Sequence, residues 1–225
     1  MKLALRELVR RPGRFSTATV ILTLIALLLM FLGGLLDGLI RASTGAIRAQ
    51  DADVIVYSDA AQASFARSRI DADLRDRVAA VEGVTEVGGI GQVQLGARVP
   101  GAGPRELTGV VLFGYEIAPS GVPPTPEPGE VWADEVLRAD GVEIGTELAL
   151  GPARSTVTVV GFVSDTSFSG QGSLWGAPET WRSVLDANRP DARVGDEVFQ
   201  ALVVRGEPSA SDLAAAIDGA TDGAT

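Results

Sequence analysis

The sequence contains no cysteine and no histidine, and its only lysine is Lys2. Without cysteine the chain forms no disulfide and has no thiolate nucleophile. Without histidine it has no Ser-His-Asp triad and no imidazole ligand for a metal ion. A phosphate-binding loop of the form G-x-x-x-x-G-K-[ST] needs a lysine behind a glycine-rich stretch, which Lys2 cannot provide. The chain therefore does not hydrolyse ATP by that route.

Other catalytic motifs are missing or incomplete. The sequence has no G-x-S-x-G elbow, and the glycine-rich stretch Gly88–Gly96 follows a strand pattern without the G-x-G-x-x-G spacing of a dinucleotide site. Asp165, Thr166 and Ser167 resemble half of an aspartic-protease motif, but no second copy exists to share a proton, so a turn is favoured. We expect no enzyme and no cofactor in this chain, with hydrolysis by a carboxylate pair as the disfavoured alternative.

Acidic residues between 71 and 82 resemble a calcium-binding loop only superficially. Asp71, Asp73, Asp76 and Glu82 are close in sequence, yet Asp76 replaces the glycine of the sharp turn and Arg75 stands at a ligand position. Asp71 or Asp73 is better explained as a helix cap. We expect no metal site.

Aromatic residues make up only 5% of the chain. Trp132, Trp175 and Trp181 are the only tryptophans, and packing in the core or at its rim explains them better than a binding patch. Tyr57 and Tyr115 are the only tyrosines. Haem ligation by either is conceivable, but both lie in strand patterns where packing accounts for them.

Charge is absent from Phe15 to Leu36, which is the longest such stretch in the chain. As an α-helix it would be roughly 33 Å long, enough to cross the hydrocarbon core of a bilayer. A cleaved signal peptide would have a shorter apolar region and a small-x-small site after it, whereas Asp37 to Arg41 follow here. The sequence predicts an uncleaved transmembrane helix.

The residues before this stretch are basic, although the whole chain has a net charge of −10. Five basic residues against the single acid Glu7 place the N-terminus in the cytoplasm and the main domain outside. They also predict anchoring of a short amphipathic helix to anionic lipid, before an elbow at Pro12-Gly13. The acidic remainder argues against a nucleic-acid partner. The proposed anchoring residues are Lys2, Arg6, Arg10, Arg11 and Arg14.

Small residues at the end of the span form a possible helix-packing face. Gly34 and Gly38 have small-xxx-small spacing, and Gly33 lies beside them. Beyond them Leu36, Ile40 and Ile47 continue a helical stripe. We expect the helix to run on as a short stalk.

The outer part alternates strand and helix patterns. Gln92 to Val99 alternates apolar and polar residues as a half-buried strand does, and Ala118–Glu130 carries five prolines typical of a loop. Further strands are predicted at 53–57, 107–115, 131–133, 145–150, 155–163 and 198–205, and helices at 71–82, from Pro178 and at 209–217. The fold class is therefore α+β.

Several segments, in this order, resemble a bacterial ABC-transporter permease of the MacB/FtsX type. They are LALRELVRRPGRF before the span, ADVIVYS outside it, VEGVTEV, PGEVWADEVLRADGVEIGTELAL and VTVVGFVSDTSFSGQGSLWGAPETW. The last two resemble especially the branch with the DevC-like and haem-exporter permeases. The resemblance covers nearly the whole chain.

The resemblance implies an outer α+β domain, a βαβ-type lobe with an inserted small β-rich lobe, between the first two of four spans. It also implies a homodimer and a separate cytoplasmic ABC ATPase that binds ATP and Mg²⁺ and drives a mechanical movement. The expected parts are an elbow helix at 1–14, the span at 15–36, a stalk at 37–50, the α+β lobe at 51–117 and 198–225, and the β-rich lobe at 118–197.

Only the first span is present, so we expect a chain that is cut before the later spans. The predicted function is the permease subunit of an ABC-type exporter or mechanotransmission complex in the bacterial cell membrane. Its cargo ranges from haem and toxic hydrophobic compounds to lipids or lipoproteins. The alternative is a single-span receptor or scaffold whose outer domain binds a ligand without transport.

Overall fold

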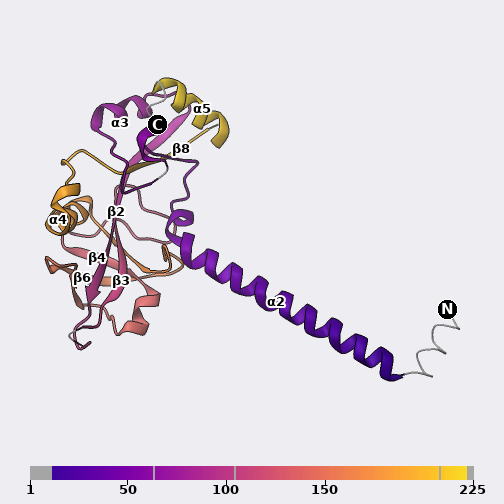
Figure 1. Cartoon of the computed structure of the whole chain (residues 1–225). Helices are drawn as coiled ribbons and strands as arrows, with labels where there is room; N and C mark the ends of the chain where they lie inside the picture. The colour runs from indigo at the N-terminus through magenta and orange to yellow at the C-terminus, as the bar shows by residue number, and fades with distance from the viewer. Residues whose placement is uncertain (1–11, 63, 104, 208, 222–225) are drawn as a thin grey trace. The chain divides into compact units, whose positions relative to one another are not determined.

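A computed structural model of the protein describes residues 12–62, 64–103, 105–207 and 209–221. The chain forms two compact units, Met1–Arg41 and Ala42–Thr225. The first contains most of the long helix α2, and the second contains the sheet with its helices (Figure 1).

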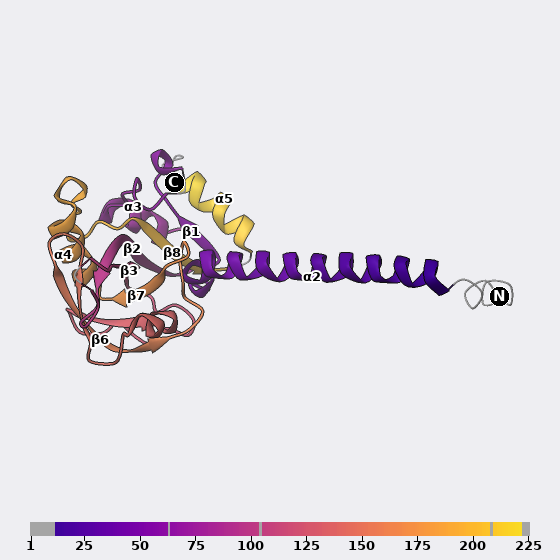
Figure 2. The same ribbon diagram turned by 60° about the horizontal axis from the view of Figure 1, so that its bottom comes forward.

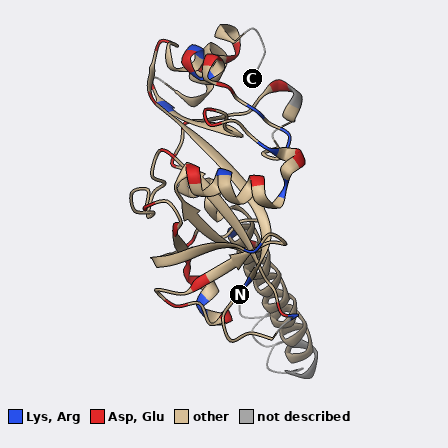
Figure 3. Cartoon of the chain, turned by 90° about the vertical axis from the view of Figure 1, so that its left-hand side faces the viewer, with Lys and Arg blue, Asp and Glu red and all other residues tan. Residues whose placement is uncertain are grey.

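Helix α2 comprises Pro12–Ala49, 38 residues without an interruption. Proline is favourable in the first turn of a helix because its missing amide proton has no partner there. In the part of the chain that is described, α2 is the one helix long and apolar enough to cross a membrane. Its large side chains from Val20 to Ile40 are exposed, and the stretch from Phe15 to Leu36 has no charged residue (Figure 3). The helix spans the residues predicted as transmembrane span and stalk.

The second unit is built on one mixed sheet of eight strands, with the order β1-β8-β2-β3-β7-β4-β6-β5. The neighbouring strands β8, β2, β3 and β7 are visible together in Figure 2. Pairs β3–β7 and β4–β6 are parallel and the others antiparallel. The strands are β1 (Val54–Val56), β2 (Val84–Arg98), β3 (Thr108–Tyr115), β4 (Glu130–Asp134), β5 (Glu147–Leu150), β6 (Ser155–Val163), β7 (Gly172–Gly176) and β8 (Ala201–Gly206).

The far end of β2 closes part of this sheet into a ring. Ala97 and Arg98 pair with Leu150 and Ala149 of β5, so β2, β3, β7, β4, β6 and β5 form a continuous circuit. Closure satisfies the backbone groups that an open edge would leave unpaired. Strands from 51–117 and 198–225 occupy one half of the strand order and strands from 118–197 the other. The division into two lobes stays a prediction.

Three α-helices pack on the sheet, and their ends follow local sequence signals. Asp71 accepts a hydrogen bond from the Leu74 amide at the start of α3 (Ala72–Ala79), and Ser209 accepts one from the Asp212 amide before α5 (Ala210–Ala220). Helix α4 (Pro178–Asn188) begins with its proline. Helices α3 and α5 lie at one end of the unit (Figure 1). The 3-10 helices are η1 (Asp59–Ala61), η2 (Glu135–Asp140) and η3 (Pro190–Ala192).

The core extends over both faces of β3. Val110 and Leu112 face the interior of the ring, whereas Val111, Phe113 and Tyr115 belong to a second cluster on the opposite face. This second cluster also contains the buried side chain of Ala46, at the end of α2. A strand buried on both faces has no polar alternation, which explains the continuous apolar run of its sequence.

Glycines of β2 allow aromatic rings to lie directly on the strand. A Cβ atom at Gly91 would stand 2.1 Å from the Trp181 ring, and one at Gly89 would stand 2.3 Å from the Phe199 ring. The two rings are stacked, with centroids 6.2 Å apart. The glycine-rich stretch is therefore a packing surface for rings.

The structure differs from the predicted elements in three notable places. Strand β2 begins at Val84, well before the predicted Gln92, because its glycine-rich first half carries no apolar alternation. Strand β7, which contains Trp175, is absent from the predicted strands. Its flanking glycines and its burial on all sides remove the usual strand pattern. Helix α3 ends at Ala79, before Gly83.

Candidate functional site

The last two turns of α2, Ala42–Ala49, belong to the second compact unit. The loop of residues 164–171, which joins β6 to β7, binds them through the backbone. The amides of Ser169 and Gly170 donate to the carbonyls of Ser43 and Ala42, each over 3.1 Å. The Ala46 amide donates to the Ser167 carbonyl over 3.2 Å. The end of the helix is thus held by several hydrogen bonds to one loop.

Gly45 permits the close approach of this loop. A Cβ atom at Gly45 would stand 2.6 Å from the Asp165 carbonyl oxygen and 2.8 Å from that of Ser167. Those distances are shorter than carbon and oxygen atoms tolerate, and both obstacles are backbone. Any side chain at position 45 would therefore push the helix and the 164–171 loop apart.

A buried carboxylate holds the 164–171 loop from the other side. Asp134, at the end of β4, is 1% exposed and accepts through Oδ2 from the Thr166 hydroxyl at 2.9 Å and the Ser167 hydroxyl at 3.0 Å. The same oxygen accepts from the Thr166 amide at 3.2 Å, while Oδ1 accepts from the Val136 amide at 3.0 Å. A buried carboxylate needs such a set of donors to offset its loss of hydration.

The hydrogen bonds continue into the aromatic core. The hydroxyls of Thr166 and Ser173 are 2.8 Å apart, and the Trp175 indole donates to Ser173 Oγ over 2.8 Å. The Trp175 ring stacks on Phe113 with a centroid distance of 4.5 Å. The loop beside the helix end is therefore tied to the centre of the sheet.

Two residues of the loop have left-handed backbone conformations. Asp165 has φ of 60° and Ser169 has φ of 51°, values that non-glycine residues rarely adopt. Each costs of order 1 kcal/mol. The contacts to Asp134 and to the helix end hold the loop in this shape.

The chain after the helix is held by β8. The guanidinium of Arg205 donates to the carbonyls of Gln50 and Asp51 over 3.2 and 3.1 Å and pairs with Glu86 at 2.8 Å. The Ser120 amide donates to the Ala49 carbonyl over 2.6 Å. Cationic and amide donors are favourable here, because the last carbonyls of a helix lack intrahelical partners.

The residues proposed for membrane anchoring and helix packing remain untested. Lys2, Arg6, Arg10 and Arg11 lie outside the described residues, and Arg14 lies in the first turn of α2. Gly33, Gly34 and Gly38 lie in α2, and a Cβ atom added at any of them would meet no atom within 4 Å. This face is therefore open.

Of the acidic motifs, Asp71 is a helix cap and Asp165 lies in the bend that follows β6. No group of acidic residues in the described ranges has the arrangement of a metal site. The tryptophans pack as predicted: Trp175 and Trp181 are fully buried, and Trp132 donates to the Pro124 carbonyl over 3.1 Å.

Tyr115 is poorly placed to ligate haem. The Tyr115 hydroxyl donates to the Pro123 carbonyl over 2.7 Å, and the side chain is 1% exposed. Burial raises the pKa of both Tyr57 and Tyr115 above that of a free phenol.

Sequence reasoning missed Asp134 and Ser173 entirely. Asp134 stands in a segment whose only signal was the family resemblance, and its partners lie 32 and 33 residues further along the chain. The local signal that exists is its hydrogen bond to the amide of Val136, two residues on, which is typical of an aspartate before a helical turn.

No family model matches this sequence, and no curated protein matches it. Among solved structures, the chain is similar to the periplasmic region of MacB from Actinobacillus actinomycetemcomitans, with 13% identity, a TM-score of 0.49, and coverage of 76% of this chain and 84% of that one. It is also similar to the extracellular domain of the noncanonic ABC-type transporter YknZ from Gram-positive bacteria, with 15% identity, a TM-score of 0.45, and coverage of 72% and 86%.

A third similar structure is a domain assigned to a permease protein from Porphyromonas gingivalis. Its identity is 17% and its TM-score 0.37, over 57% of this chain and 64% of that one. The DevC-like or haem-exporter branch stays a prediction.

Proposed function

We propose that this chain is the membrane-anchored outer part of a permease subunit in an ABC-type exporter or mechanotransmission complex. It lies in the bacterial cell membrane with the N-terminus in the cytoplasm and works as a homodimer. A separate cytoplasmic ATPase hydrolyses ATP. The finer assignment, to the DevC-like and haem-exporter branch, belongs to this proposal.

The observation that carries the proposal is the attachment of the end of α2. A simple membrane anchor needs only a flexible tether between helix and domain. Here residues 42–49 are hydrogen-bonded to the 164–171 loop, and Asp134 ties that loop to β4. A displacement of the helix end therefore acts directly on the sheet, as transmission of force from a partner ATPase requires.

Two features of the sequence support the same function. The permease-like segments occur in the order and at the spacing of that family, and the chain lacks the lysine-containing phosphate loop of an ATPase. The uncharged stretch of α2 from Phe15 to Leu36, preceded by basic residues, supports the membrane location.

Isolation of the protein from its own membrane tests the proposal. The gene would be tagged at its chromosomal locus, and the protein purified in mild detergent beside an unrelated single-span protein with the same tag. We expect a co-purifying ATPase with a G-x-x-x-x-G-K-[ST] loop and ATP hydrolysis that disappears when the loop lysine of the partner is replaced.

Purification without any nucleotide-binding partner, both before and after chemical crosslinking, would contradict the proposal. That outcome would favour the alternative function, a single-span receptor or scaffold. An ATPase that also co-purifies with the control protein would count against the proposal equally.

A further inference from the structure

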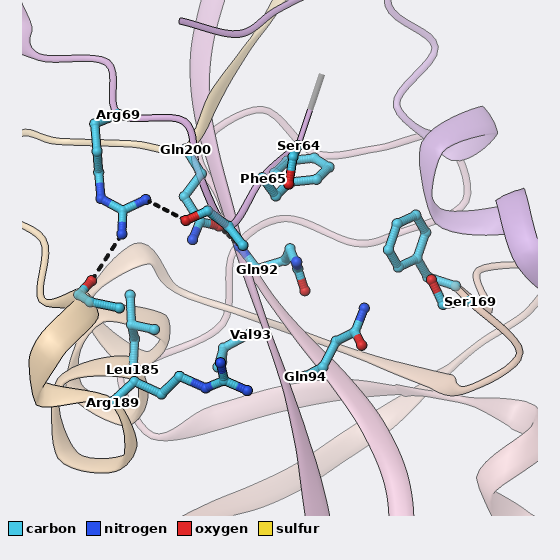
Figure 4. A pocket seen from close by; sticks show the side chains of 13 residues that line it. Ser64, Phe65, Arg69, Gln92, Val93, Gln94, Ser169, Leu185, Arg189 and Gln200 are labelled. Atoms are coloured by element: carbon cyan, nitrogen blue, oxygen red, sulfur yellow. Dashed lines mark hydrogen bonds between the residues drawn. The ribbon is translucent and has the colours of Figure 1, made fainter. Parts of the chain in front are cut away.

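The second compact unit contains a cavity of about 470 Å³ beside β2. Its walls come from β2, the segment before α3, the end of α4, the 164–171 loop, η3 and the residue before β8. Figure 4 shows Gln92 and Gln94 extending from β2 to the same side, with Arg69 held by the hydrogen bonds drawn as dashes. The volume is within the usual range for small-molecule sites, about 300–1,000 Å³.

The cavity is cationic in an acidic protein. The chain has a net charge of −10, yet no aspartate or glutamate is among the residues that line the cavity, whereas Arg69 and Arg189 are. A wall with only positive charge attracts anions and repels cations. This property is local and opposite to that of the whole chain.

The two arginines have different roles. The guanidinium of Arg69 is fixed by backbone carbonyls, donating to Ser68 over 2.6 Å and to Ala192 over 3.1 Å. For the exposed guanidinium of Arg189, the described part of the chain provides no hydrogen-bond or ion-pair partner. Arg69 thus supplies a positioned charge, and Arg189 is available to form a bidentate pair with a carboxylate.

Carboxamides supply the rest of the polar wall. Gln200 is buried, and its Oε1 accepts a hydrogen bond from the backbone amide of Gln92 over 2.6 Å. This bond orients the Gln200 carboxamide against β2. Gln92 Oε1 is buried and has no donor among the described residues. A buried acceptor without a donor is unfavourable, so an N–H group of a ligand would stabilise it. Gln94, beside it on β2, is exposed and offers a second carboxamide.

We propose that this cavity binds a short peptide or peptide-like molecule with a free carboxylate. The carboxylate pairs with Arg189, and an amide N–H of the ligand donates to Gln92 Oε1. The apolar side chains of Phe65, Val93 and Leu185 accommodate an aliphatic part of the ligand. This site concerns the outer domain alone and does not depend on a partner ATPase.

Phe168 and Ser169 also line the cavity, and both belong to the 164–171 loop that holds the end of α2. A bound molecule therefore touches the loop that contacts the helix. A bound molecule stabilises the loop conformation to which it binds. Because the same loop contacts the end of α2, occupancy of the cavity is linked to the position of the helix end.

Calorimetric titration of the full chain in lipid nanodiscs tests the site. The probes are N-acetylated Ala-Ala-X tripeptides with each amino acid at X, each compared with its C-terminal amide and with inorganic phosphate. We expect at least one tripeptide with a free C-terminal carboxylate to bind. Its C-terminal amide should have an affinity lower by about tenfold or more. Arg189→Gln and Gln94→Glu should each weaken binding similarly, the second by placing a negative charge beside the ligand.

Arg77→Gln is the matched control, because it removes one positive charge from an exposed position on α3 outside the cavity. It should leave the affinity unchanged, and circular dichroism should show all variants folded. The proposal is overturned if no peptide binds at ~5 mM, since that corresponds to less than ~3 kcal/mol of binding free energy. It is also overturned if the amides bind equally well, if phosphate binds as tightly as the peptides, or if Arg77→Gln has the effect of Arg189→Gln.

Discussion

The Thr166 hydroxyl donates a hydrogen bond of 2.9 Å to Asp134 Oδ2, across 32 residues of sequence. Asp134 ends β4, whereas Thr166 lies in the loop after β6, and these two strands are parallel neighbours. Because parallel strands end at the same edge of a sheet, the carboxylate can reach the loop of the next strand. The same loop binds the end of α2, so this hydrogen bond connects the sheet to the helix.

Replacing Asp134 should destabilise the outer domain strongly. In Asp134→Ala the amide and hydroxyl donors of Thr166 and the hydroxyl of Ser167 lose their acceptor inside the protein. We expect a loss of about 3 kcal/mol in the free energy of unfolding. Urea denaturation of the full chain, followed by tryptophan fluorescence, measures it. The exposed Asp140, at the end of η2, is the control, and Asp140→Ala should have almost no effect.

A side chain at position 45 should separate the helix end from the loop. In Gly45→Ala the new methyl group would collide with the carbonyls of Asp165 and Ser167, and we expect a cost of about 1–3 kcal/mol. Hydrogen exchange should become faster at the amides of Ser169 and Gly170, which donate to the helix.

The control for Gly45 is in the same helix. Gly38→Ala meets no atom within 4 Å and should be neutral or stabilising by up to about 1 kcal/mol, as alanine favours a helix over glycine. Equal effects of the two substitutions would show that helix propensity, and not contact with the loop, determines the result.

The tyrosines should ionise late as the pH rises. Burial raises the pKa of Tyr57 and Tyr115 in the folded chain, whereas unfolded tyrosines ionise near pH ~10. The protonated phenols therefore stabilise the fold below that pH, and this stabilisation is lost as the pH rises through the folded pKa values. Phenolate absorbance in native and denatured samples measures the shift, and Tyr57→Phe isolates the signal of Tyr115. Ionisation near pH ~10 in the folded state would contradict the expectation.

The open glycine face of α2 predicts a helix contact in the membrane. Gly34→Leu should weaken homodimerisation by about tenfold, because a leucine prevents close approach of the two helices. Energy transfer between labelled copies in nanodiscs measures association. Ala18→Leu adds the same side chain on the opposite side of the helix, by the 3.6-residue repeat, and should have no such effect.

Much of the fold follows from signals within a few residues. Asp71 caps α3 through an amide three residues away, and Ser209 does the same for α5. The alternation from Gln92 to Val99 correctly predicted the second half of β2, with Val93 and Ala97 buried and Gln94 exposed. Local hydrogen bonds and side-chain periodicity are visible in a single sequence because they depend only on neighbours.

Other features required the assembled structure. The glycine-rich half of β2 has no alternation, since Gly89 and Gly91 exist to accommodate the rings of Phe199 and Trp181 from distant segments. Strand β7 is too short and too completely buried to show a period. The cavity beside β2 collects residues from six segments, and no spacing in the sequence relates them.

The sequence by itself determined the uncharged stretch from Phe15 to Leu36, its basic N-terminal flank, the α+β class and the lack of a nucleotide loop, because each depends on composition or on neighbouring residues. Only the tertiary structure decided that Asp134 binds Thr166 and Ser167, that Gly45 contacts the 164–171 loop, and that Arg189 shares one cavity with three glutamines. These relationships depend on which strands become neighbours. Strand order is set by packing of the whole chain, which no local pattern encodes.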